Sequence, residues 1–150
     1  MHPLAHMLTG ALIGQVAPSP IAAGLGGLLS HGVLDSIPHA EGETFGIRET
    51  SLVRPDLVEA GIETIIGAVL LWQIGSRCAA ARAEQLAVGA VAALVPDLVD
   101  IPLKQFLGVM ILHVHRLHWT VRRKHAAWGI LTQVVTVGGA TLLLWRTACR

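Results

Sequence analysis

Charged side chains are scarce in this sequence, and tyrosine is absent from it. Only 14% of the residues are charged and 53% are hydrophobic, whereas an ordinary soluble domain has about 25% charged residues. The mean hydropathy is correspondingly positive, at +0.60. This balance argues against a cytosolic enzyme and favours a small protein whose helices lie in a membrane.

Several other features are missing, and each absence argues against a class of function. The two cysteines, Cys78 and Cys149, stand far apart and form neither a disulfide framework nor a CxxC site. A net charge of +1, without a basic patch that has interleaved aromatic residues, argues against a nucleic-acid partner. The N-terminus lacks the positive region of a signal peptide, so we expect the protein to insert by its own helices. Without a Gly-x-Ser-x-Gly motif or a Cys–His dyad, a serine or cysteine nucleophile is not expected.

Apolar runs separated by prolines and polar residues predict an all-α protein. At 150 residues we expect a single membrane-embedded domain, residues 1–150, folded as a small polytopic bundle of about four to five helices. Some of these helices are expected to be short or broken, because proline removes a backbone hydrogen bond. The helices are expected at residues 2–16, 20–37, 55–74, 83–95 and 125–145.

The most informative stretch is a glycine-rich apolar run that ends in three polar groups, His31, Asp35 and His39. On a helix, residues four apart lie on nearly the same face, so His31 and Asp35 should point the same way. Pro38 is expected to end this helix just before His39. Imidazole and carboxylate suit zinc and related divalent ions. The alternative is a buried hydrogen bond in which Asp35 orients the histidine ring.

Further polar groups interrupt the apolar chain. Asp97 and Asp100 follow Pro96, and a broken helix at membrane depth tends to line a cavity; the alternative is a helix end capped in water. His115 and His118 are three apart and share a helix face. Glu63 precedes an apolar run by one turn, whereas Glu59 fits a solvated face.

Taken together, these motifs resemble a known family. They are His6-x-x-Thr9-Gly10, Ser30-His31-x-x-x-Asp35-x-x-Pro38-His39, Pro96-Asp97-x-x-Asp100 and His115-Arg116-x-His118. In this order they resemble the bacterial membrane-bound metal-dependent hydrolases, which are distantly similar to zinc-dependent phospholipase C. The chain departs from the family pattern because Asp97 and Asp100 are one residue further apart and no histidine follows them. The resemblance implies an integral protein of the bacterial inner membrane.

The leading hypothesis is therefore a metal-dependent hydrolase of a lipid or another membrane-associated ester or phosphoester. The expected ligands of a divalent metal, with zinc preferred, are His6, His31, Asp35, His39, Asp100, His115 and His118. Asp97 or Glu63 would take a proton from water, and Arg116 would hold a phosphate oxygen. One alternative is a non-enzymatic membrane protein with a structural metal site or a buried polar network. A metal or proton carrier is a third hypothesis.

Overall fold

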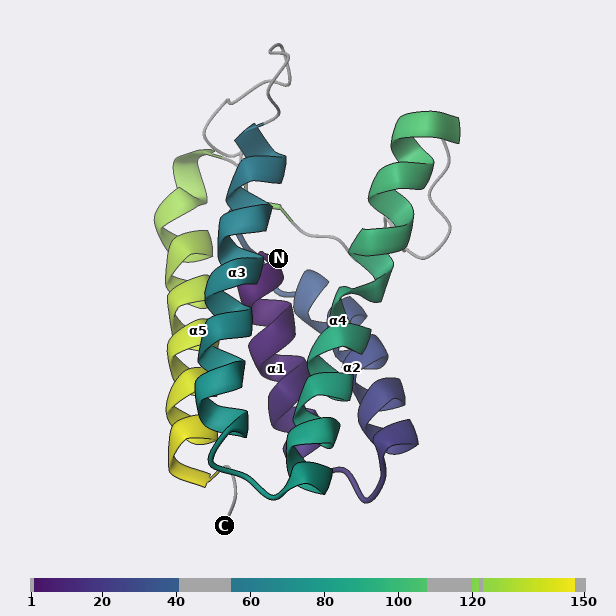
Figure 1. The fold of residues 1–150 in the computed structure, drawn as a ribbon. Helices are drawn as coiled ribbons and strands as arrows, with labels where there is room; N and C mark the ends of the chain where they lie inside the picture. The colour runs from purple at the N-terminus through teal and green to yellow at the C-terminus, as the bar shows by residue number, and fades with distance from the viewer. Residues whose placement is uncertain (1, 41–54, 108–119, 122, 148–150) are drawn as a thin grey trace.

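The computed structural model describes residues 2–40, 55–107, 120–121 and 123–147. Within these ranges the chain forms five α-helices and one short 3₁₀ helix, with no strand, which confirms the all-α prediction (Figure 1). The helices are α1 (Pro3–Val16), α2 (Pro20–Asp35), α3 (Pro55–Gly75), α4 (Ala80–Leu107), η2 (Arg123–His125) and α5 (Ala126–Thr147).

Proline and serine set where the first helices begin. Pro3 and Pro20 stand at the first positions of α1 and α2, where the missing N–H of proline has no helical partner to lose. Ser19 precedes Pro20, and its hydroxyl accepts a hydrogen bond from the Ala22 N–H at 3.2 Å. This contact satisfies one of the free N–H groups at the start of α2.

The fourth helix differs from the prediction. We expected it to end near Val95, but α4 continues through Pro96 and Pro102 to Leu107. Its ribbon bends partway along instead of ending (Figure 1). A proline can kink a helix without ending it, and α4 packs against both α1 and α2.

Helix α1 lies at the centre of the bundle and contacts α2, α3, α4 and α5 (Figure 1). Glycines allow its close approach to α4. A Cβ atom at Gly89 would overlap the carbonyl oxygen of Gly10, and one at Gly27 would overlap the carbonyl oxygen of Gly89. Small residues let helix backbones meet in this way, so Gly10, Gly27 and Gly89 hold α1, α2 and α4 together at one level.

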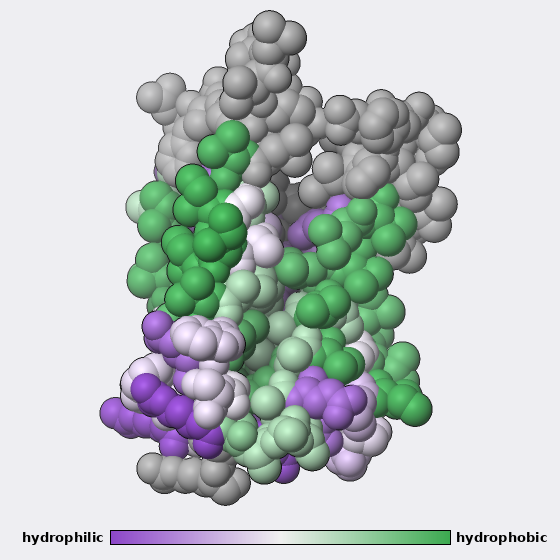
Figure 2. Space-filling model, viewed as in Figure 1, coloured by the Kyte–Doolittle hydropathy of each residue, from purple (hydrophilic) through white to green (hydrophobic). Residues whose placement is uncertain are grey.

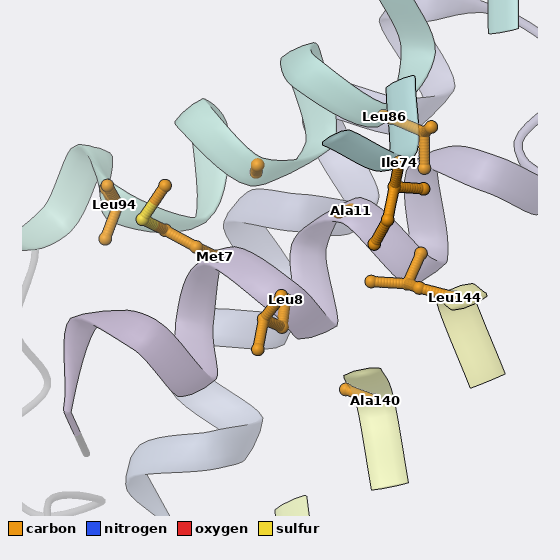
Figure 3. Close-up of a cluster of buried hydrophobic side chains, with 9 residues drawn as sticks. Met7, Leu8, Ala11, Ile74, Leu86, Leu94, Ala140 and Leu144 are labelled. Carbon is orange, nitrogen blue, oxygen red and sulfur yellow. The ribbon is translucent and has the colours of Figure 1, made fainter. Parts of the chain in front are cut away.

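A cluster of buried apolar side chains fills the space between α1, α3, α4 and α5 (Figure 3). Leu8, Leu86 and Leu144 are its largest fully buried members. Cys78 packs against this cluster and is disulfide-bonded, so the expectation of isolated cysteines is wrong for Cys78. The other cysteine, Cys149, lies outside the described residues.

The outer surface of the bundle is apolar over much of its length. Two segments are long and apolar enough to cross a membrane, Val58–Gly75 of α3 and Ala126–Thr147 of α5. Figure 2 shows hydrophobic residues along α3 and over the α2–α4 side, with hydrophilic residues gathered near the turn between α3 and α4. Trp128 and Trp145 are exposed near the two ends of α5, where an aromatic belt would place them.

Candidate functional site

The site is built around three buried polar side chains from two helices, His6 on α1 and His31 and Asp35 on α2. His6 is 0% exposed, and His31 and Asp35 are each 4% exposed. Asp35 lies between the two rings, with Oδ1 3.3 Å from His6 Nε2 and Oδ2 3.1 Å from His31 Nε2. One ligand atom from each residue lies within 4.8 Å of the others. The structure therefore brings together three of the predicted metal ligands.

A backbone carbonyl sets the orientation of the His31 ring. His31 Nδ1 lies 2.8 Å from the carbonyl oxygen of Ala93 on α4. A carbonyl only accepts hydrogen bonds, so Nδ1 carries the proton and donates it. In the neutral ring, the Nε2 lone pair then faces the carboxylates.

The geometry of the three groups fits a divalent metal ion. Two ligand atoms of a tetrahedral zinc, each about 2.0–2.1 Å from the metal, lie roughly 3.3 Å from each other, close to the N···O separations around Asp35. Metal-bound histidines commonly donate their other N–H to a carbonyl, as His31 does to Ala93. In addition, the rings of His6 and His31 stack with centroids 4.0 Å apart. Two protonated rings would repel at this distance, whereas neutral rings can share one cation.

Asp97 borders the cluster from α4. Its Oδ1 lies 3.8 Å from His31 Nε2, and its side chain is 20% exposed, against 5% for Asp35. Asp97 is thus close enough to act on a molecule bound at the cluster and is also more accessible. This position agrees with the expected role of Asp97 as a proton acceptor, which stays a prediction.

His39 is fully buried but does not belong to the group of ligand atoms that lie within 4.8 Å of one another. Its Nδ1 donates to the carbonyl oxygen of Ile37 at 2.8 Å. Its backbone is also held, because the Val121 N–H donates to the His39 carbonyl oxygen at 2.8 Å. The role of His39 as a metal ligand stays a prediction.

Glu63 belongs to a second polar group, which lies at the beginning of α1. Its Oε1 lies 2.8 Å from His2 Nδ1, and its Oε2 accepts a hydrogen bond from the Leu4 N–H at 3.3 Å. Glu59 Oε1 is 3.6 Å from the same His2 nitrogen. The hydrogen bond to Glu63 raises the pKa of His2 above its ordinary value of 6.5, against the opposing effect of burial.

The remaining predicted site residues lie outside the part of the chain that the structure describes. They are His115, Arg116, His118 and the side chain of Asp100. Sequence reasoning missed His2 and the Ala93 carbonyl. Glu59 was assigned to a solvated face, which agrees with the 53% exposure of its side chain, but its approach to His2 was not foreseen. The spacing of four between Glu59 and Glu63, which puts both carboxylates on one helix face, was a signal for the second group. No sequence signal marks a single backbone carbonyl.

The comparisons with known proteins add no assignment. No protein family, curated protein or solved structure matches the chain. The candidate function therefore depends on the geometry described above and on the resemblance of the sequence motifs.

Proposed function

We propose that this protein is a membrane-embedded, metal-dependent hydrolase of an ester or phosphoester, with a lipid or another membrane-associated molecule as its substrate. The observation that carries the proposal is the cluster of His6, His31 and Asp35, whose burial and spacing suit a divalent ion such as zinc. A buried carboxylate among apolar helices is costly unless it is paired or bound to a cation. The motif resemblance supports an assignment to the bacterial inner membrane.

The side chains around the cluster have separate tasks in this proposal. Asp35 and the two imidazoles would hold a divalent ion, which would supply an acidified water and a Lewis acid for the ester oxygen. The Ala93 carbonyl keeps His31 Nε2 turned inward. Asp97, 3.8 Å from His31 and more exposed than Asp35, would accept a proton from water.

The apolar exterior bears on the substrate. Both helices that are long and apolar enough to span a bilayer, α3 and α5, pack against α1, so a site on α1 and α2 would lie close to the hydrocarbon phase. Molecules concentrated there are lipids and lipid-linked esters. This is the reason to test phospholipids first.

The test combines metal analysis with a hydrolysis assay on detergent-purified protein. We expect a stoichiometric transition metal, with zinc preferred, and release of a hydrolysis product from phospholipid vesicles. His31→Ala with Asp35→Ala should lose both the metal and the product. His125→Ala is the matched control, because His125 is an exposed histidine of η2 and should retain both. Metal-free wild-type protein from a chelator-free preparation would contradict the proposal.

A structural metal site is the second candidate, and the burial of the cluster favours it. Structural sites have all positions filled by protein ligands, whereas catalytic sites keep one position for water or substrate. His6, His31 and Asp35 are all nearly inaccessible, as a structural site requires. Metal binding without hydrolysis of any ester tested, together with loss of folding in the metal-free protein, would support this second candidate.

A further inference from the structure

The second polar group, His2 with Glu59 and Glu63, is separate from the cluster that carries the proposed function. His2 precedes α1, and both glutamates lie on α3. One ligand atom from each of the three residues lies within 4.8 Å of the others. His2 and His6 are four residues apart, so the two groups are offset by about 6 Å along α1.

Both ring nitrogens of His2 face oxygen acceptors. Nε2 lies 3.2 Å from the carbonyl oxygen of Ala40, and Nδ1 lies 2.8 Å from Glu63 Oε1. A neutral imidazole carries one N–H and one lone pair. Since the Ala40 carbonyl takes the N–H of Nε2, Nδ1 is the ring nitrogen that faces the two carboxylates.

The ligand atoms are already oriented by groups outside the three residues. The Leu4 N–H binds Glu63 Oε2, which leaves Oε1 directed at His2. The Ala40 carbonyl that fixes the His2 ring is itself held by Gln133 Nε2 of α5 at 2.7 Å. Such supporting contacts hold metal ligands in one rotamer and one tautomer.

We propose that His2, Glu59 and Glu63 form a second divalent-cation site. Its side chains are 21%, 53% and 21% exposed, respectively, so an ion and its water ligands can enter from solvent, unlike at the nearly inaccessible first cluster. One imidazole and two carboxylates leave coordination positions for water. This ligand set suits Mn²⁺, Fe²⁺ or Zn²⁺. The second site does not depend on the first cluster or on hydrolysis.

The experiment is a Mn²⁺ titration of the full-length, tag-free protein in detergent, followed by electron paramagnetic resonance. We expect the wild type to bind two Mn²⁺ ions. The double variant Glu59→Gln/Glu63→Gln should keep only the ion at the first cluster. Asp35→Asn should keep only the ion at the second site. Glu59→Gln alone provides a milder variant, because Glu59 is half-exposed and its loss does not disturb packing. Glu59→Gln should weaken the binding of the second ion at least about tenfold. Glu84→Gln on α4 is the matched control and should bind as the wild type does.

The outcomes for the two sites are distinguishable. If the double glutamine variant and Glu59→Gln both bind Mn²⁺ as the wild type does, the second site is overturned and the proposed function is untouched. If Asp35→Asn changes nothing while Glu59→Gln weakens binding, the second site stands and the first cluster is no metal site. If the double variant fails to fold by circular dichroism, Glu59→Gln alone decides between these results.

Discussion

His6 and His31 stack face to face, with ring centroids 4.0 Å apart and an angle of 15° between their planes. The two residues are 25 positions apart in the sequence and belong to different helices. Asp35 contacts both rings through separate oxygens. The three side chains therefore form one unit, and a change in any of them should affect the whole unit.

The first prediction concerns metal removal. An ion that binds only the folded state, at a concentration a hundredfold above its dissociation constant, stabilises by about 2.7 kcal/mol. We therefore expect a chelator to lower the thermal unfolding midpoint of the wild type and to leave His31→Ala unchanged. The effects of His6→Ala and His31→Ala should not add, because either change removes the same ion. Additive effects, measured by thermal unfolding in detergent, would argue against a shared ion.

The second prediction separates proton transfer from metal binding. Asp97→Asn keeps the size of the side chain and removes its basicity. A general base contributes about 10²–10⁴-fold to a rate, so ester hydrolysis should fall by that factor while the metal content stays at the wild-type level. Stopped hydrolysis assays and elemental analysis on the same preparation measure both. Simultaneous loss of metal would instead make Asp97 a ligand.

The third prediction tests the close approach of α1 and α4. In Gly89→Ala, the new methyl group would overlap the Gly10 carbonyl oxygen, and overpacking of this kind costs about 1–3 kcal/mol. Gly138→Ala on α5 is the matched control, because a Cβ there has no atom within 4 Å. Replacing an open helical glycine by alanine stabilises by about 0.5–1 kcal/mol. The free energies of unfolding in detergent should therefore change in opposite directions.

The fourth prediction tests the membrane location. Val135 lies near the middle of α5 and is 63% exposed. On a protein surrounded by water, Val135→Lys would change stability by less than about 0.5 kcal/mol. At the centre of a bilayer, a lysine costs about 2.5–3.5 kcal/mol for insertion. We expect Val135→Lys to reduce the membrane-inserted fraction, whereas Ala127→Lys, near the end of the helix, should insert normally. Equal insertion of both variants would place α5 outside the bilayer.

The sequence predicted much of the secondary structure because its signals are local. Prolines mark the starts of α1, α2 and α3, and the apolar runs between them are too long and too uniform for strands. The spacing of four placed His31 and Asp35 on one face of α2, and the structure confirms their contact at 3.1 Å. The end of α4 was predicted wrongly, because packing against α1 and α2 supports a proline kink that local rules read as a helix end.

The sequence by itself determined which residues are apolar, where the first three helices begin and which candidate ligands share a helix turn. Only the tertiary structure decided that His6 stacks on His31, that Ala93 orients the ring and that Glu63 pairs with His2 rather than with the cluster. The physical reason is that these contacts join separate helices. Their alignment depends on how closely Gly10, Gly27 and Gly89 let the helices approach, and no local pattern encodes that register.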